Sequence, residues 1–195
     1  MGKIFCLIGK SAAGKDALYN ALLNDEELSL KPFVTHTTRP RREGEQNGHE
    51  YFFSTEEEMA GFEKSSKLIE KRTYHTVYGD WFYFSVDGGH INLEEKNYLY
   101  IGTLESFLHM RDYYTAARTV PLYVEVEDGE RLLRAIKREQ QQKEPGYKEL
   151  CRRFLADSED YSEEKLAQAG IKKRFNNAGF DECVREISSY IKEES

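Results

Sequence analysis

The sequence has few cysteines and no long apolar run. Its three cysteines, Cys6, Cys151 and Cys183, are scattered and form no C-x-x-C pair. This distribution argues against a disulfide framework and a structural zinc site, and it indicates a reducing compartment. No apolar stretch approaches the ~20 residues that a membrane helix needs, and the N-terminus lacks the pattern of a secretion signal. We therefore expect a cytoplasmic protein with no membrane partner.

The sequence also lacks an excess of positive charge. Its 28 lysines and arginines face 35 aspartates and glutamates, which gives a net charge of -7. Such a chain has no global basic field to attract nucleic acid, so any anion must be bound by local arginines. We expect a small phosphorylated ligand and no nucleic-acid partner. A length of 195 residues suits one compact domain with a smaller inserted or lid element.

One glycine-rich stretch near the start organises the rest of the chain. The apolar run from Ile4 to Ile8 is followed by Gly9-Lys10-Ser11-Ala12-Ala13-Gly14-Lys15-Asp16. The spacing G-x-x-x-x-G-K, between a buried strand and a helix-like segment, predicts a phosphate-binding P-loop. Backbone N–H groups and the helix N-terminus would bind phosphate oxygens, and Lys15 would reach the outer phosphates. The alternative is an ordinary strand-turn-helix joint that is rich in small residues.

Asp16 stands where a P-loop normally has serine or threonine, whose hydroxyl binds the magnesium of the nucleotide. A carboxylate is a hard oxygen ligand and can also hold magnesium. We interpret Asp16 as a candidate metal ligand. An acid that only complements the helix dipole is an alternative of equal weight.

A second segment, residues 37–48, is a predicted loop with concentrated positive charge. Arg39 and Arg42 lie three residues apart with Pro40 between them. Two guanidinium groups at this spacing can converge on one phosphate through forked hydrogen bonds. The alternative, a solvated basic turn, is less attractive beside a P-loop.

A third segment, residues 128–160, is predicted to be a charged helical hairpin that is broken at Pro145-Gly146. Arg131, Arg134 and Arg138 share one helix face there. Such a hairpin is most often solvated surface. In a nucleotide kinase, however, it is a lid whose arginines close over the transferred phosphate.

The order of predicted elements indicates an α/β fold. Strands over 97–101 and 119–126 flank a helix over 104–114, and this order implies parallel pairing. Residues 171–175 form a weak last strand, and an amphipathic helix follows over 180–192. We expect a three-layer P-loop fold with a central parallel sheet. The predicted parts are a core of residues 1–32, 91–127 and 168–195, an insertion of residues 33–90 and a lid of residues 128–167.

The P-loop and the stretch from Thr35 to Phe53 resemble the guanylate kinase family, and the resemblance covers nearly the whole chain. The second motif is similar to that family's nucleoside-monophosphate loop almost residue for residue. The resemblance implies that residues 33–90 bind a nucleoside monophosphate. It assigns the acceptor phosphate to Arg39, Arg42, Tyr51 and Tyr78, the guanine edge to Thr35 and Glu70, and the lid positions to Arg134, Arg138 and Arg153.

Three positions depart from the pattern of that family. Asp16 replaces the P-loop hydroxyl, and Asp80 replaces a serine or threonine that helps to hold the base. After Leu99-Tyr100 the usual acidic pair is absent. We expect that the acids have been relocated, with Asp16 near the metal and Asp80 near the base.

The resemblance implies an enzyme that uses ATP and Mg²⁺ to phosphorylate a nucleoside monophosphate, with GMP as the favoured acceptor. One alternative is a non-catalytic module that keeps the fold and binds a protein in the acceptor cleft. Another is a kinase with a different phosphorylated acceptor. The sequence leaves open whether the chain is a monomer or a homodimer.

Overall fold

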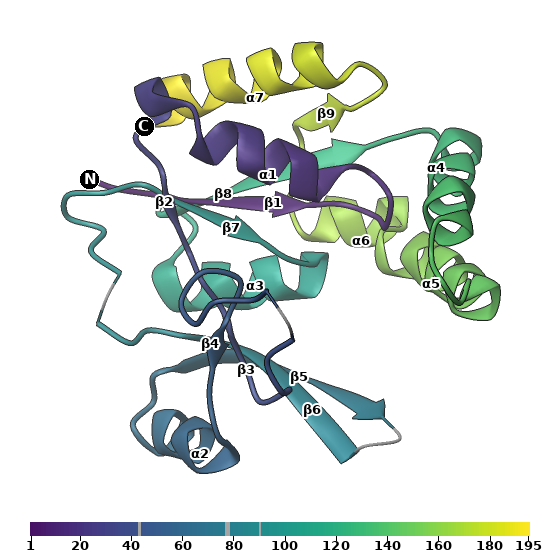
Figure 1. Cartoon of the computed structure of the whole chain (residues 1–195). Coiled ribbons are helices and arrows are strands. Elements are labelled where there is room, and N and C mark those ends of the chain that lie inside the picture. Colours follow the sequence, from purple (N-terminus) through teal and green to yellow (C-terminus); the bar gives the residue numbers. More distant parts are fainter. Residues whose placement is uncertain (43, 77–78, 90) are drawn as a thin grey trace.

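The structure, a computed structural model, describes residues 1–42, 44–76, 79–89 and 91–195. Within these residues the chain forms a central sheet, a second sheet and a helical arm (Figure 1). The elements of the central part are β1 (Ile4–Ile8), α1 (Lys15–Leu23), the 3-10 helix η1 (Glu26–Leu28), β2 (Lys31–Pro32), β7 (Tyr98–Ile101), α3 (Leu104–Tyr114), β8 (Thr119–Glu125), β9 (Arg174–Asn176) and α7 (Phe180–Glu194).

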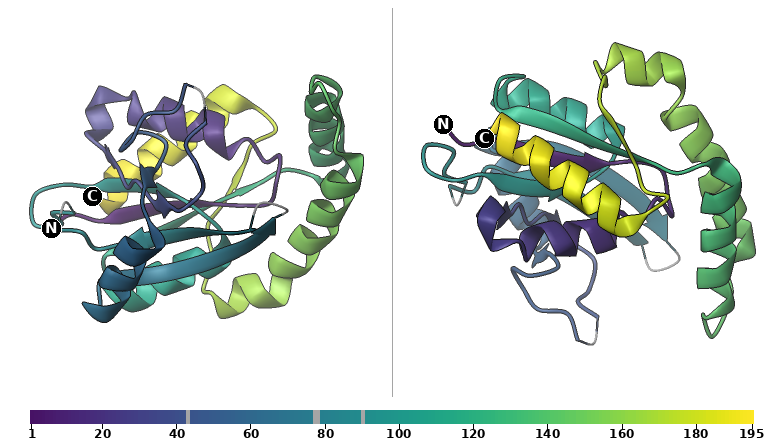
Figure 2. Two further views of the ribbon diagram at one scale, coloured as in Figure 1. Left: turned by 60° about the horizontal axis from the view of Figure 1, so that its bottom comes forward. Right: turned by 90° about the horizontal axis from the view of Figure 1, so that it is seen from above.

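The central sheet has the strand order β2-β7-β1-β8-β9, and every pairing is parallel. All residues of β1 are buried because helices cover both faces of the sheet. Helices α1 and α7 lie over one face and α3 lies over the other (Figures 1 and 2). The predicted α/β fold with a central parallel sheet is confirmed.

The second sheet has the order β4-β3-β6-β5 and is accompanied by helix α2 (Glu56–Lys64). Strands β5 (Leu68–Thr76) and β6 (Gly79–Val86) form a long antiparallel hairpin in which Glu70 lies opposite Ser85. Strands β3 (His36–Thr37) and β4 (Phe52–Phe53) have two residues each. The aromatic pattern of residues 49–53 favours a longer strand, but residues before Phe52 use their backbone groups in turns, such as the bond from Gly48 N–H to Tyr51 O.

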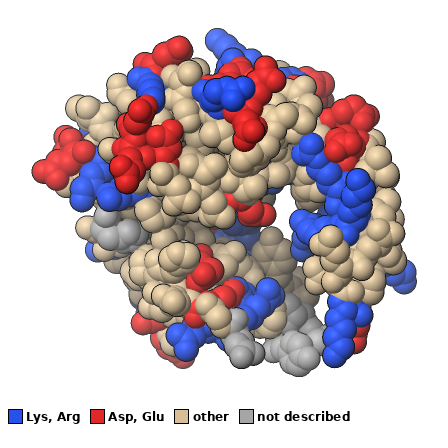
Figure 3. Space-filling view, turned by 45° about the horizontal axis from the view of Figure 1, so that its top comes forward, with Lys and Arg blue, Asp and Glu red and all other residues tan. Residues whose placement is uncertain are grey.

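The arm consists of α4 (Asp128–Gln140), α5 (Tyr147–Asp160) and α6 (Glu163–Gln168). Helices α4 and α5 stand beside the sheet at the end where the P-loop lies, and a gap separates them from the second sheet (Figures 2 and 3). Cys151 is exposed on α5, whereas Cys6 on β1 and Cys183 on α7 are buried, and all three are free. The domain bounds expected from the sequence stay a prediction.

Among the described residues, none of the helices combines the length and the apolar character that a membrane crossing requires.

Candidate functional site

The P-loop connects the carboxyl end of β1 to the first turn of α1. Gly14 caps the helix in the left-handed region with φ 87°, and Ala12 also has a positive φ of 62°. Glycine adopts this conformation without the strain that a Cβ atom would cause. The buried side chain of Asn177, which precedes α7, donates 2.8 Å from Nδ2 to Ala13 O. Asn177 directly follows β9, so this hydrogen bond ties the P-loop to the carboxyl end of that strand.

Lys15 is the first residue of α1, and its side chain is folded back over the loop. Its Nζ atom donates to Gly9 O at 2.6 Å and to Lys10 O at 3.1 Å. Burial lowers the pKa of Lys15, and the charges of Arg131 and Arg138 lower it further, while Asp16 and Asp157 oppose the shift. Five charged groups from the loop and the arm therefore lie within electrostatic reach of one another.

Asp16 occupies the second position of α1 and is exposed. Its carboxylate supplies the hard oxygen that magnesium prefers, and magnesium commonly takes one or two carboxylates together with water and substrate phosphates. The described residues contain no group of three or more histidines, cysteines and acids that could hold a metal by themselves. The donor set thus fits magnesium that arrives with a nucleotide.

Arg39 is buried in the basic loop and is held by a carboxylate from the same loop. Its Nη1 and Nη2 atoms donate to Glu45 at 2.8 and 2.5 Å, and its Nε donates to the Tyr83 hydroxyl at 3.2 Å. The guanidinium also lies 5.3 Å from the ring centre of Tyr51. Arg39 and Tyr51 are therefore in contact, and most N–H groups of Arg39 are already bound.

Arg42 is exposed, and its backbone N–H donates to Glu45 at 2.7 Å. Glu45 thus holds both ends of the segment from Arg39 to Arg42. Thr35 is half-buried, and its carbonyl accepts from the N–H of Phe52 at 2.9 Å. Tyr78, which the resemblance assigns to the acceptor phosphate, lies outside the described residues.

Glu70 on β5 is buried and lies between the second sheet and the end of β7. Its Oε1 accepts from the Ser85 hydroxyl at 3.0 Å and from the Tyr100 hydroxyl at 3.3 Å. Its Oε2 accepts from Nε of Arg72 at 3.2 Å. Three donors therefore already bind this carboxylate.

Asp80 is far from Glu70 in this arrangement. It pairs with His75 at 2.7 Å near the end of the hairpin where β5 leads into β6, whereas Glu70 pairs with Ser85 five positions along β6. At ~3.3 Å per residue, this places Asp80 roughly 16 Å from Ser85 along the strand. The structure does not bring Asp80 and Glu70 to one base edge.

The predicted lid arginines lie on α4 and α5. Arg134 donates to Glu130 and to the carbonyl of Asn177, both at 3.0 Å, and Arg153 donates to Glu149 at 2.9 Å. Arg138 is exposed, and its guanidinium has no hydrogen-bond or ion-pair partner in the part of the chain that the structure describes. Basic side chains gather on the arm in Figure 3, along the edge that faces the gap.

Comparison with known proteins identifies the relatives of this chain. The sequence pattern that defines the family described as guanylate kinase matches residues 1–85. A guanylate kinase of Mycoplasma mobile is 42% identical over 79 residues, which are 40% of this chain and 39% of that protein. A guanylate kinase of Porphyromonas gingivalis is 31% identical over 116 residues, which are 58% of this chain and 60% of that protein. Over residues 1–85 the chain is thus similar to the guanylate kinase family.

The likeness of fold to a guanylate kinase extends further along the chain than the likeness of sequence. The crystal structure of guanylate kinase from Anaplasma phagocytophilum superimposes with a TM-score of 0.62 over 99% of this chain and 86% of that one, at 19% identity. The sequence matches cover less than two thirds of the length of the Mycoplasma and Porphyromonas guanylate kinases.

Two charged residues join the arm to the P-loop, and sequence reasoning missed one of them, Asp157. Asp157 on α5 accepts from Ser11 N–H at 2.8 Å and from Arg131 at 3.0 Å. Arg131 on α4 is buried, donates to Ser11 O at 3.1 Å and to Asp128 at 2.9 Å, and lies 4.3 Å from the ring centre of Phe154. The helix-face pattern located Arg131 but gave no sign of its partners.

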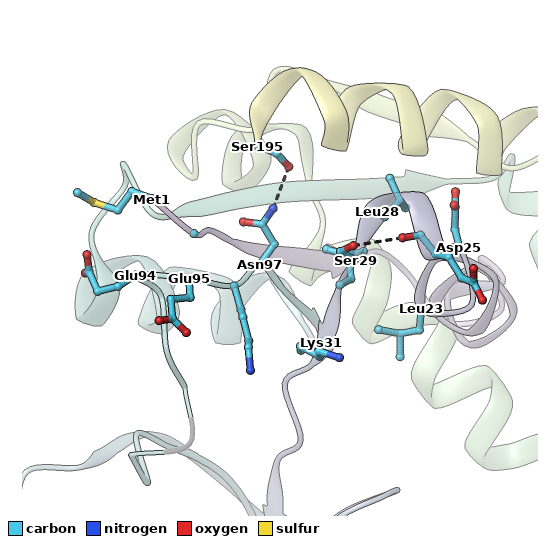
Figure 4. A pocket seen from close by; sticks show the side chains of 14 residues that line it. Met1, Leu23, Asp25, Leu28, Ser29, Lys31, Glu94, Glu95, Asn97 and Ser195 are labelled. Carbon is cyan, nitrogen blue, oxygen red and sulfur yellow. Dashed lines mark hydrogen bonds between the residues drawn. The ribbon is translucent and has the colours of Figure 1, made fainter.

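A groove of about 680 Å³ lies at the opposite end of the central sheet from the P-loop (Figure 4). Lys31, Glu94, Glu95 and Asn97 line it, and Asn97 donates to the Ser195 hydroxyl at its rim. In parallel α/β sheets, ligands bind beyond the carboxyl ends of the strands. This groove lies at the amino ends, so we do not assign it to the nucleotide site of the guanylate kinase fold.

Proposed function

We propose that this protein transfers the γ-phosphate of ATP to a nucleoside monophosphate, with GMP as the favoured acceptor. The observation that carries the proposal is the P-loop, where Lys15 is folded over a left-handed turn within electrostatic reach of Arg138. A protein-binding module that uses only the acceptor cleft has no physical need for this phosphate cradle. The match of residues 1–85 to the guanylate kinase family also supports the proposal.

On the donor side, the N–H groups of the P-loop and the first turn of α1 would bind the phosphates of ATP. Lys15 would exchange its two carbonyl partners for phosphate oxygens, since its present bonds to Gly9 and Lys10 lie within the loop itself. Asp16 would hold magnesium together with the phosphates. When bound there, the metal ion would neutralise charge on the transferred group.

On the acceptor side, Arg42 would bind the phosphate through its guanidinium, while Arg39, Tyr51 and the loop held by Glu45 would shape that site. An oxygen of the acceptor phosphate forms a bond to the γ-phosphorus, and the bond from that phosphorus to the bridging oxygen of ADP breaks. When the arm closes, Arg138, Arg134 and Arg153 would approach the transferred phosphoryl group. Their positive charges would balance the negative charge that develops on this group in the transition state.

Thr35 and Glu70 would contact the base, and a carboxylate favours the N1–H donor of guanine over the N1 acceptor of adenine.

An ADP-coupled assay with GMP, dGMP, IMP, AMP, CMP and UMP tests the proposal. We expect turnover with GMP that depends on magnesium and that Lys15→Ala removes. Absence of turnover with all six acceptors would refute the kinase assignment, and equal turnover of AMP or a pyrimidine nucleotide would refute the preference for GMP.

A further inference from the structure

The two carboxylate oxygens of Glu70 accept different numbers of hydrogen bonds, and this difference decides which bases the carboxylate can distinguish. A carboxylate oxygen has two lone pairs for hydrogen bonds. Oε1 receives two donors, the hydroxyls of Ser85 and Tyr100, whereas Nε of Arg72 is the only donor to Oε2 among the residues that the structure describes. One lone pair therefore remains, and it is on Oε2.

The two hydroxyls that cover Oε1 are built into the core. Ser85 and Tyr100 each have 0% exposed surface, and the ring of Tyr100 packs edge-on against Phe33 at 5.5 Å. Gly102 makes room for this ring, since a Cβ atom at that position would lie 2.5 Å from a ring carbon of Tyr100. A base that binds Glu70 cannot replace these donors without unpacking the core.

Arg72 supplies the complementary half of the pair. Its side chain is one quarter exposed, and its terminal nitrogens have no hydrogen-bond partner among the described residues. The Arg72–Glu70 pair thus offers N–H donors beside one acceptor. The 6-oxopurine edge has the matching order, with the O6 acceptor beside the N1–H donor, whereas adenine has the reverse order.

From these contacts we infer that Tyr100 and Ser85 are specificity-determining residues that make the site accept 6-oxopurine monophosphates with or without a 2-amino group. The inference rests on the proposed function and defines the class of its acceptor as 6-oxopurine monophosphates. The 2-amino group of guanine would need a second acceptor, and Oε1 has none to give. We therefore expect GMP and IMP to be similar acceptors. AMP is disfavoured because the N–H donors of Arg72 would face the 6-amino donor of adenine.

The test measures kcat/KM for GMP, IMP and AMP, and binding of the same nucleotides by calorimetry, on the full chain. For the wild type we expect GMP and IMP within about tenfold of each other, and AMP lower by about 10²-fold. Tyr100→Phe removes one donor from Oε1 and should raise the GMP to IMP ratio by about three- to tenfold, through KM rather than kcat. Ser85→Ala should act in the same direction.

Tyr114 provides a matched control. Its ring also packs against Phe33, with 6.4 Å between the ring centres, and its buried hydroxyl has no hydrogen-bond partner among the described residues. Tyr114→Phe should therefore leave the GMP to IMP ratio unchanged. A wild-type preference for GMP over IMP of 100-fold or more would overturn the inference, as would an unchanged ratio in both Tyr100→Phe and Ser85→Ala. Equal binding of GMP and IMP without turnover would support it while refuting the kinase assignment.

Discussion

The carboxylate of Asp157 accepts a 2.8 Å hydrogen bond from the backbone N–H of Ser11, and it thereby joins helix α5 directly to the P-loop. The same carboxylate binds Arg131, whose guanidinium also donates to the Ser11 carbonyl. Both backbone groups of one P-loop residue are therefore held by the arm. The conformation of the loop and the position of the arm are coupled through these contacts.

Replacement of Asp157 by alanine should weaken this coupling. The change leaves the buried Arg131 with one carboxylate fewer and Ser11 N–H without its acceptor, at a cost of about 1–3 kcal/mol in unfolding free energy. We expect KM for ATP to rise several-fold while KM for the acceptor changes little. Asp160→Ala, a change at an exposed residue of the same helix, is the control. Equal effects of the two variants would contradict the role of Asp157.

Lys15→Ala should lower kcat by about 10²-fold or more, because the lysine charge acts on the phosphates in the transition state. The fold should persist, since the described partners of the Lys15 side chain are carbonyls of its own loop. Steady-state kinetics and circular dichroism check both parts. Lys31→Ala, in the groove at the far end of the sheet, should change neither. Unchanged turnover in Lys15→Ala would remove the kinase proposal.

Arg39→Lys and Arg42→Lys should each weaken acceptor binding more than ATP binding. A lysine keeps the charge but loses the planar fork, which at Arg39 spans both oxygens of Glu45. Arg39→Lys should also lower the melting temperature, because its fork is buried. Arg41→Lys, at the exposed neighbouring position, is the control. The acceptor site lies elsewhere if KM for ATP and for the acceptor rise equally.

The Arg39–Glu45 pair also predicts a dependence of stability on pH. Hydrogen bonds from Arg39 and from the Arg42 backbone lower the pKa of Glu45 from 4.5 to about 2. A carboxyl group with a lowered pKa in the folded state contributes stability that is fully present above pH 4.5 and is lost as the pH falls toward 2. Urea unfolding from pH 6 to 3 should thus show a shallower decline for Glu45→Gln than for the wild type. Parallel curves would contradict this.

Glu70→Gln should erode most of the preference for GMP over AMP, because the amide can present a donor to the N1–H donor of guanine. Competition between the two nucleotides in the coupled assay measures the preference. Asp80→Ser should leave this preference intact, since Asp80 pairs with His75 near the end of the hairpin where β5 leads into β6, away from Glu70. A preference that survives Glu70→Gln would show that another group recognises the base.

The sequence predicted those elements whose pattern is local. The helix expected over 104–114 has these bounds in α3, because Thr103 caps its start and apolar residues recur along one face. Parallel pairing followed from the alternation of strands and helices. Short strands such as β4 could not be predicted with correct bounds, since turns that depend on tertiary contacts decide where they begin.

The contacts of the site were harder to predict than its residues. The P-loop motif located Lys15, yet the bond between Ser11 and Asp157 spans 146 positions and leaves no trace in spacing. A buried arginine such as Arg131 has the same sequence signature as an exposed one on a charged helix. The partners of Glu70 depend on how β5, β6 and β7 meet, which only the assembled sheets define.

Only one of the three described cysteines, Cys151 on the arm, is exposed, so a thiol reagent can label the arm selectively. Burial raises the pKa of Cys6 well above its usual range and that of Cys183 to about 11, so neither reacts readily as a thiolate. Cys151 is exposed on α5, six residues before Asp157. A maleimide dye at neutral pH would therefore attach to the arm without any engineered substitution. Its fluorescence anisotropy would follow the arm as nucleotides bind.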